Sequence, residues 1–449
     1  MAAAPDHDEG GDTAVANLVL IGAGWWGQGW HLPHMHRNER VNISAIVDSN
    51  PHPESNLNPN LESLDTLSSR YGCPNYRSLT DLLRDPNVGP NVDGAVVCTP
   101  HSTHFEIGRE LIAEGRRRYE EAIVARGGRR ENDDDEDDDS LRFRPVNVLM
   151  EKPMTTDVDE ARALHELLMD RRRAGGGSDA GTTIGGGVGC FLVNHSANYR
   201  PQARAARSIV ESGGIGTIRH VTAFLASPLS WIFDDPSNTG WNEPDRRSSG
   251  MIGNGFAWGQ SSHVLAWVYH AVGPGRLVPS RVHCVMTHSD ATGADVSHAA
   301  TVTCECGAAI SLSGTSLLPG NAHSDPPVPK EVVIHIFGTR GALSYCGNDR
   351  DPSSGRLEWS SRHDDDCEDE KENGSCGAVE VQCSQLGFQF EELDQDGIGP
   401  SSMQYFIDAC LGHDDYHVGA DCLVGLRCVQ TIDAMYRSNA SGNCENVKV

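Results

Sequence analysis

The sequence contains no uncharged apolar run of about 18 residues, so it offers no segment typical of a membrane-spanning helix. Its first sixteen residues lack the basic head and apolar stretch of a secretory signal, and we therefore expect a cytoplasmic protein. Basic residues are also scarce: 36 Lys and Arg stand against 63 Asp and Glu, which gives a formal net charge of −27. Because a nucleic-acid partner needs a basic face, this balance argues against one.

Metal and disulfide motifs are missing as well. Fourteen cysteines are scattered along 449 residues, and none forms a C-x-x-C pair. In a chain without a secretory signal, this pattern indicates reduced thiols. Three histidines, His31, His34 and His36, lie close together, but Pro33 interrupts them and no thiol partner is near. We therefore predict no metal site.

The excess of acid is concentrated in two short runs. Residues 131–139 carry eight acids, and residues 364–372 carry seven acids and one lysine. Such runs repel themselves and are too poor in apolar residues to pack, so they indicate solvated surface loops. We place them in acidic insertions at about 116–144 and about 350–385.

The length exceeds what one hydrophobic core usually supports, so two domains are expected. Up to residue 194, apolar strand-like runs alternate with amphipathic helical segments, which predicts an N-terminal Rossmann domain with a parallel sheet over 16–194. From 195 to 438, one helix is followed by longer strand-like runs and then two helices. This order predicts an α/β domain with a large, mostly antiparallel sheet.

The segment VLIGAGWWG places Gly22, Gly24 and Gly27 in G-x-G-x-x-G spacing directly after the first apolar run. The first glycine allows a tight turn, the second lets the backbone approach a pyrophosphate, and the third lets helix pack on strand. The next run ends in Asp48, in the region where an acid holds a ribose diol. Because Asp48 would repel a 2′-phosphate, NAD is favoured and NADP remains an alternative.

Two further turns should lie at the carboxyl edge of the same sheet, where open α/β sheets bind ligands. Thr99 and Pro100 end one apolar run, with His104 close behind, and Glu151 and Lys152 end another, in front of Pro153. A lysine at this edge can hydrogen-bond a substrate hydroxyl and stabilise an alkoxide as a hydride leaves. The segment 193–201 starts the second domain, so Asn194 and Tyr199 are candidate substrate contacts, with a linker role as the alternative.

Together these motifs resemble the Gfo/Idh/MocA oxidoreductases, the family of glucose-fructose oxidoreductase and inositol dehydrogenase. The resemblance runs from about residue 17 to 438, and it is carried by Gly22-Ala-Gly-Trp-Trp-Gly27, Thr99-Pro100, Glu151-Lys152-Pro153, Asn194 and His263. It implies a bound nicotinamide cofactor, a sugar, polyol or inositol substrate, and a homo-oligomer through the C-terminal sheet. The motifs and the resemblance predict a cofactor-binding set of Gly22, Gly24, Trp26, Gly27, Asp48, Thr99, Pro100, His104 and Glu151.

The resemblance also implies two catalytic residues, because Lys152 matches the catalytic lysine of the family and His263 matches its histidine. Members similar to inositol dehydrogenase carry an aspartate four residues before that histidine, one helical turn away. Here that position is Gly259, and the nearest polar replacement is Gln260, which can orient a ring or a substrate hydroxyl but cannot take up a proton. His263 therefore stays open between acid–base catalysis, substrate hydrogen bonding and an ordinary buried histidine.

The sequence leaves several functions open. The leading hypothesis is an NAD(P)-dependent dehydrogenase acting on CH–OH groups. A glycosidase or lyase that retains its NAD would cleave substrate without net NADH formation. The missing aspartate favours a non-catalytic sensor, whereas Lys152 argues against one, because a sensor would not need this cation. A reductase would run the same chemistry in the opposite direction, on an aldehyde or ketone.

Overall fold

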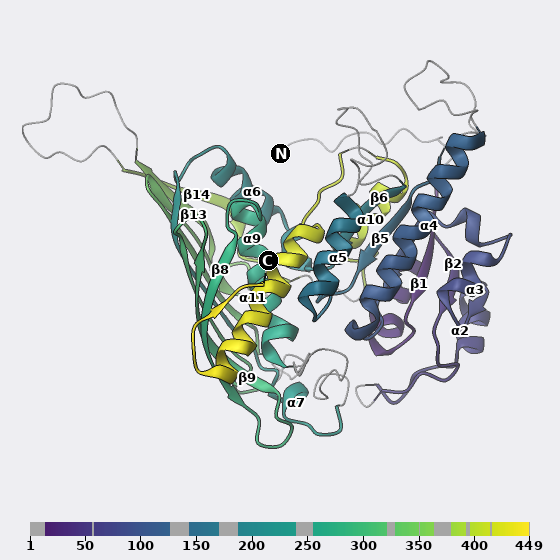
Figure 1. The fold of residues 1–449 in the computed structure, drawn as a ribbon, viewed down its shortest axis with the longest axis horizontal. Coiled ribbons are helices and arrows are strands. Elements are labelled where there is room, and N and C mark those ends of the chain that lie inside the picture. Colours follow the sequence, from purple (N-terminus) through teal and green to yellow (C-terminus); the bar gives the residue numbers. More distant parts are fainter. Residues whose placement is uncertain are drawn as a thin grey trace, which may run out of the picture.

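The computed structural model describes residues 14–55, 58–125, 143–169, 187–238, 255–320, 328–349, 351–362, 379–391, 396–413 and 415–448. The acidic runs at 131–139 and 364–372 lie outside these residues. Two sheets form the framework, with helices α9 and α11 between them (Figure 1). This arrangement confirms the predicted fold class, a parallel Rossmann-type sheet followed by a larger, mostly antiparallel one.

The first sheet is parallel throughout and has the strand order β3-β2-β1-β4-β5-β6. Its strands are β1 (Ala16–Ile21), β2 (Val41–Val47), β3 (Asn75–Tyr76), β4 (Gly94–Val97), β5 (Val146–Met150) and β6 (Val188–Val193). Every residue of β4 and β5 is buried, as expected for strands covered on both faces. The edge where these strands end therefore collects the loops predicted to bind ligand.

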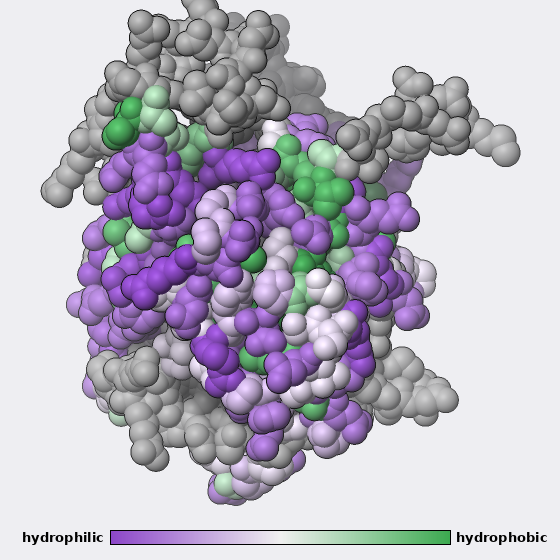
Figure 2. Space-filling view, turned by 90° about the vertical axis from the view of Figure 1, so that its right-hand side faces the viewer, coloured by the Kyte–Doolittle hydropathy of each residue, from purple (hydrophilic) through white to green (hydrophobic). Residues whose placement is uncertain are grey.

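Helices pack on both faces of this sheet. They are α1 (Leu32–Arg37), α2 (Leu64–Tyr71), α3 (Leu79–Arg84), α4 (His104–Ala125) and α5 (Val158–Met169), with a π-turn at Gly27–His31 and short 3₁₀ turns at Gly89–Asn91 and His101–Thr103. Ser63 and Ser78 cap α2 and α3 by accepting a backbone N–H with the side-chain oxygen. The outer surface of this layer is predominantly hydrophilic (Figure 2).

The second sheet has the order β14-β13-β12-β11-β7-β10-β9-β8-β15, and all its neighbours are antiparallel except the pair β7 and β10. Its strands are β7 (Ile218–Ala226), β8 (Pro279–His288), β9 (Asp295–Cys304), β10 (Ala309–Thr315), β11 (Glu331–Gly338), β12 (Gly341–Asn348), β13 (Arg356–Arg362), β14 (Val379–Gly387) and β15 (Glu445–Asn446). Buried and exposed residues alternate along β8 and β9, so one face of the sheet packs inward.

The remaining helices cover the inner face of this sheet or fill the space between the sheets. They are α6 (Pro201–Glu211), α7 (Ser230–Phe233), α9 (Ser262–Val272), α10 (Ser401–Cys410) and α11 (Cys422–Ser441), with a 3₁₀ turn at Ser196–Tyr199 and a π-turn at Ala257–Ser261. Among the described helices, none is both long and apolar enough to cross a membrane.

Two predicted boundaries differ from the packing. Helix α4 continues to Ala125, strand β13 ends at Arg362 and strand β14 begins at Val379, so the described parts of 116–144 and 350–385 include regular structure. Helix α10 packs Met403, Phe406 and Ile407 against the first sheet, although it lies inside the range predicted as the second domain. Sequence periodicity predicts which face of a helix is apolar, but not which sheet that face will meet.

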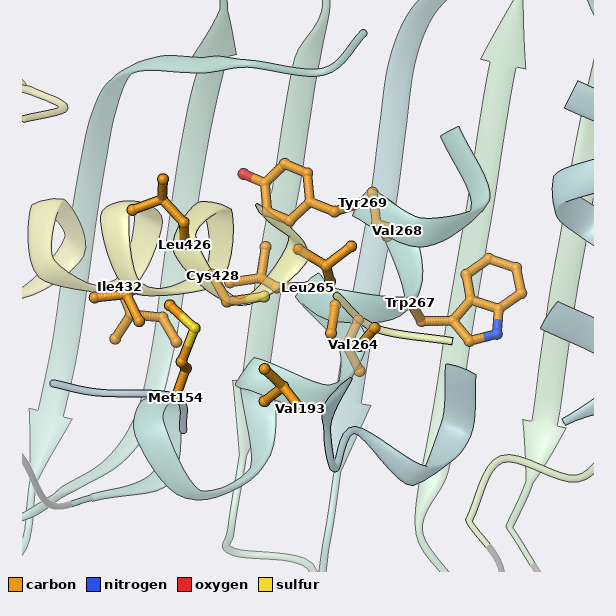
Figure 3. Packing of buried hydrophobic residues seen from close by; sticks show 14 of the residues in the cluster. Met154, Val193, Val264, Leu265, Trp267, Val268, Tyr269, Leu426, Cys428 and Ile432 are labelled. Atoms are coloured by element: carbon orange, nitrogen blue, oxygen red, sulfur yellow. The ribbon is translucent and has the colours of Figure 1, made fainter. Parts of the chain in front are cut away.

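A shared apolar core joins the two layers directly behind the predicted catalytic loop. Met154 and Val193, at the ends of two segments of the first layer, face side chains of α9 and α11 such as Leu265 and Ile432 (Figure 3). All four are almost fully buried. Because close-packed interiors resist displacement, this core holds the Lys152 loop and the beginning of α9 in a fixed relation.

Candidate functional site

The glycine turn between β1 and α1 is packed so closely that two of its glycines have no room for a side chain. Gly22 has φ +102°, and a Cβ there would lie 2.7 Å from the Cys98 carbonyl carbon. A Cβ on Gly27 would lie 2.2 Å from the Gly22 carbonyl oxygen. A Cβ on Gly24 would meet no described atom within 4 Å. This contrast fits the expected roles, with two positions for packing and one where the backbone can approach a pyrophosphate.

Asp48 ties the end of β2 to this turn. Its Oδ2 accepts the Ala23 backbone N–H at 2.7 Å, and its Oδ1 accepts the Asn50 N–H at 2.8 Å. The carboxylate is only half-buried, so it lies at the sheet edge beside the glycine turn. Its contact with a ribose diol stays a prediction.

His104 connects the turn after β4 to the loop that contains Lys152 and Pro153. Its Nδ1 lies 2.9 Å from the Pro153 carbonyl oxygen and its Nε2 lies 3.0 Å from the Thr99 carbonyl oxygen. Burial lowers the pKa of His104, despite these two carbonyl contacts, and the ring is 1% exposed. His104 was expected to bind cofactor, but both ring nitrogens face backbone, so the geometry instead supports holding Thr99 beside the Lys152 loop. Pro100 is exposed at the same turn.

Glu151 is the centre of a buried polar group that we call the Glu151 cluster, formed by Trp26, His31, Glu151 and Asn194. Its Oε1 lies 3.0 Å from Trp26 Nε1, 2.9 Å from His31 Nε2 and 2.7 Å from Asn194 Nδ2. Burial raises the pKa of Glu151, but these contacts and the charge of Lys152 outweigh it and lower the pKa to about 2. The Glu151 carboxylate is therefore ionised at neutral pH, and the cluster connects the glycine turn to β5 and β6.

Lys152 is the cation at this edge. The Lys152–Pro153 peptide bond is cis, and the Nζ of Lys152 donates a hydrogen bond of 2.6 Å to the carbonyl oxygen of Gly259. Burial is the largest cause and, together with the positive charge of Lys330, lowers the pKa of Lys152 to about 8. The negative charges of Glu151 and Glu391 raise the pKa but do not outweigh burial. An amine in this position is cationic at neutral pH but loses its proton more easily than an exposed lysine.

Two histidines lie next to Lys152. The rings of His195 and His263 meet edge to face, with centroids 5.5 Å apart. Burial, with the charge of Lys152 as the next cause, lowers the pKa of His195 to about 3 and that of His263 well below its ordinary value. Both rings are therefore neutral at pH 7, and a neutral imidazole can accept a proton.

Several buried polar atoms around Lys152 have no hydrogen-bond partner among the described residues. They are Asn194 Oδ1, His195 Nδ1, Gln260 Oε1 and His263 Nδ1. A buried acceptor without a partner is costly, and such atoms gathered at one place indicate a site for a polar ligand. These residues thus fit a polar ligand that offers several hydrogen-bonding groups.

Tyr199 does not fit its predicted role. It is fully buried in the core cluster beneath the first sheet, and its hydroxyl donates to the Val193 carbonyl at 3.4 Å. The structure therefore does not support a substrate contact for Tyr199. Asn194 and His195 are also buried, but they lie beside Glu151 and His263, whereas Tyr199 packs in the apolar core. Sequence position alone does not distinguish these places.

The structure adds residues that the sequence did not single out. Glu391, which follows β14, has its Oε1 3.9 Å from His263 Nε2 and forms a buried ion pair with Lys330. His31, considered only for a metal cluster, instead contacts Glu151. Glu391 lies 128 residues after His263, so no local spacing could have connected them.

Comparison with known proteins gives two family matches. A family described as "Oxidoreductase family, NAD-binding Rossmann fold" matches residues 16–118, and the "GFO/IDH/MocA C-terminal domain" matches residues 203–344. One curated relative, assigned as an oxidoreductase subunit of UDP-kanosamine synthase from Amycolatopsis mediterranei, is 22% identical over 258 residues. That match covers 57% of this chain and 51% of the relative, so the chain spans about half the length of that protein.

Solved structures share the fold. GenD2 from gentamicin A biosynthesis, in complex with NAD, is 18% identical with a TM-score of 0.61, over 99% of this chain and 100% of that one. The WlbA dehydrogenase from Bordetella pertussis, in complex with NADH and UDP-GlcNAcA, is 18% identical with a TM-score of 0.56, over 97% of this chain and 99% of that one. At such identities the likeness shows the fold alone. The family matches confirm the predicted NAD-binding domain.

Proposed function

The chain belongs to the GFO/IDH/MocA oxidoreductase family, and from this premise we propose that it is an NAD-dependent dehydrogenase acting on a hydroxyl group of a sugar, a polyol or an inositol. One observation carries the proposal: the Lys152 amine donates to the carbonyl of Gly259, four residues before His263. A cation from the first sheet and an imidazole from α9 are thereby brought to one place, at the edge where the glycine turn would seat a nucleotide.

The glycine turn, Asp48 and the Thr99 turn would hold the cofactor, and when bound, NAD supplies the hydride acceptor. Lys152 would hydrogen-bond the substrate hydroxyl and stabilise the negative charge that develops on its oxygen. His263 would take the hydroxyl proton at Nδ1, the ring atom without a described partner. Asn194 and Gln260 would orient the other hydroxyl groups.

The Glu151 cluster would act beneath the site. The Glu151 carboxylate lies one residue from Lys152, so its charge favours the cationic amine despite burial. Since Glu151 also contacts Trp26 on the glycine turn, the same group positions the cofactor side and the substrate side of the site. Preorganisation of this kind lowers the reorganisation needed during the reaction.

The substrate class is tested by screening aldoses, polyols, inositols and nucleotide sugars, the last because a structural neighbour was solved with UDP-GlcNAcA. Each is incubated with the purified protein and NAD or NADP, and reduced nicotinamide is followed by absorbance. Turnover with one substrate class would support the proposal. Cleavage of a glycoside without net NADH would favour the NAD-retaining hydrolase, and binding of NAD without turnover would favour a sensor.

Lys152→Met tests the mechanism. We expect kcat to fall by about 100-fold or more, since removing one donor to a developing oxyanion has effects of this size, while the Kd for NAD changes little. Lys448→Met is the matched control, because Lys448 pairs with Asp433 at the partly exposed end of the chain. Turnover that survives Lys152→Met unchanged would remove this lysine from the chemistry.

We also propose that the chain forms a homo-oligomer through the outer face of its second sheet. Val285 and Phe337 are exposed on β8 and β11, at positions that alternate with buried residues. Exposed apolar side chains on a sheet face are typical of an interaction surface. Light scattering of the wild type and of a Val285→Lys/Phe337→Lys variant tests this, and an unchanged monomeric mass in both would contradict it.

A further inference from the structure

A buried ion pair lies beside His263 and comes from a distant part of the chain. Lys330 and the side chain of Glu391 are each less than 10% exposed, and the Nζ of Lys330 pairs with Oε2 of Glu391. The other carboxylate oxygen, Oε1, lies 3.9 Å from Nε2 of His263. This separation is longer than a hydrogen bond, and it would be an ion pair only with a protonated ring.

The carboxylate is held there by its backbone. Glu391 donates its backbone N–H to Asp349 Oδ1 at 2.9 Å, and Asp349 donates its own N–H to the carbonyl of Lys330 at 2.7 Å. Asp349 is 1% exposed. The start of β11, the end of β12 and the segment after β14 therefore converge on one point. Charged groups are expensive to bury, so a pair fixed this firmly next to a catalytic candidate indicates a role beyond packing.

We propose that Glu391 is the carboxylate partner of His263 and supplies, from another part of the fold, the acidic group that position 259 lacks. The inference rests on the proposed dehydrogenase function. Glu391 is a positioning residue, because it acts through His263 rather than on the substrate. Lys330 pairs with the second oxygen of this carboxylate and so holds its position.

The geometry gives each ring nitrogen a separate task. A carboxylate beside Nε2 favours the tautomer that carries its proton on Nε2, as in triads where an acid orients a histidine. Nδ1 then holds a lone pair and can receive the hydroxyl proton of the substrate. The O–H bond would break as the Nδ1–H bond forms, bound NAD would supply the acceptor for the hydride of the same carbon, and the Glu391 carboxylate would lie beside the resulting imidazolium.

The other charged groups around His263 lower its basicity, which makes a nearby carboxylate more important for proton uptake by the ring. Lys152, after β5, and Lys330, directly before β11, both disfavour a positive ring. His195 packs against the ring edge to face, and Asp349 accepts the backbone N–H of Glu391. Two cations next to a proton acceptor lower its basicity. Among the described residues, the Glu391 carboxylate lies 3.9 Å from Nε2, and under this proposal its negative charge would oppose the two cations.

The test compares Glu391→Gln with the wild type by two readouts. In the protein without substrate, ¹⁵N NMR of the histidine rings, with His263→Gln to assign the signal, reports the tautomer and the pKa of His263. We expect the variant to lose the preference for a proton on Nε2 and to have a lower His263 pKa. With substrate, kcat/KM should fall by about 100-fold, and its acidic limb should move to lower pH by about one unit.

Glu114→Gln is the matched control, because Glu114 is equally buried and paired with Arg117 and Arg118 on α4, away from the site. It should lose stability without changing the His263 signal or the pH profile. If Glu391→Gln unfolds because Lys330 is left unpaired, Lys330→Met/Glu391→Gln removes both charges and should give the same His263 changes. Glu391→Asp should recover part of the activity.

The outcomes separate the two proposals. If no substrate is turned over by the wild type, the dehydrogenase proposal fails, while the NMR comparison still decides whether Glu391 orients His263. If the wild type is active and neither the His263 signal nor the pH profile changes in Glu391→Gln, the role of Glu391 is refuted. A uniform loss of activity at every pH, with an unchanged His263 tautomer, would also refute it and indicate a purely structural ion pair.

Discussion

Replacing Glu151 by glutamine keeps the shape of the side chain and removes its charge at the centre of the Glu151 cluster. Oε1 contacts donors on Trp26, His31 and Asn194, and Oε2 accepts the backbone N–H of Lys152. A glutamine can offer one oxygen but must turn its NH₂ group toward the other set of donors. At least one buried donor then loses its acceptor, so we expect the variant to be less stable.

The magnitude follows from the ionisation of Glu151. Burial raises its pKa, but the contacts with His31 and Asn194 and the charge of Lys152 lower it overall, from 4.5 to about 2. The side chain is 12% exposed, so solvent screening is weak. A lowering of this size corresponds to roughly 3 kcal/mol of folding stability from the ionised form. Because the folded pKa is the depressed one, this stability is present above about pH 4.5 and is lost as the pH falls toward 2.

The assay is urea unfolding of the wild type and Glu151→Gln at pH 7 and pH 3, followed by tryptophan fluorescence and circular dichroism. We expect a difference of roughly 3 kcal/mol at pH 7 and less than half of that at pH 3. Asn147→Ala is the control, since Asn147 is a buried, neutral residue of β5, the strand that Glu151 follows, and its effect should not depend on pH. An equal effect of Glu151→Gln at both pH values would refute a charged cluster.

Three further predictions concern the cofactor side and the pH profile. Gly27→Ala should weaken NAD binding at least tenfold and destabilise the fold by about 1–3 kcal/mol, because its Cβ would lie 2.2 Å from the Gly22 carbonyl oxygen. Calorimetry measures the affinity for NAD, and thermal melts measure the stability. Asp48→Ala should narrow the preference for NAD over NADP, and equal affinity ratios before and after would show that the acid does not face the ribose. Burial lowers the pKa of Lys152 to about 8, so kcat/KM should decline as the pH rises through 8 and this decline should be missing in Lys152→Met.

Local sequence was sufficient for the framework of the site. Gly22 and Gly27 are predictable because their lack of a side chain is a requirement of the turn itself, and the buried run Val148-Leu149-Met150 predicts an interior strand whose end must lie at the ligand edge. Lys152 follows from the same argument, since it comes directly after that strand. Each of these inferences uses only neighbours a few residues apart.

Side-chain direction was less predictable. Asn194, His195 and Tyr199 share one short segment, yet the first two lie at the site and Tyr199 lies in the core. His104 turned both ring nitrogens toward backbone. In a turn between domains there is no strand or helix period to assign faces, so packing decides which side chain enters the apolar core and which faces the site.

The alternation of apolar strands and helices, together with the glycine turn, determined the Rossmann layer, its nucleotide edge and the position of Lys152 along the chain, because these depend on short-range periodicity and backbone sterics. Only the tertiary structure decided that α10 returns to the first sheet and that Glu391, 128 residues after His263, supplies a carboxylate beside it. Contacts of this kind depend on how distant segments pack on a common core, and no pattern of neighbouring residues encodes them.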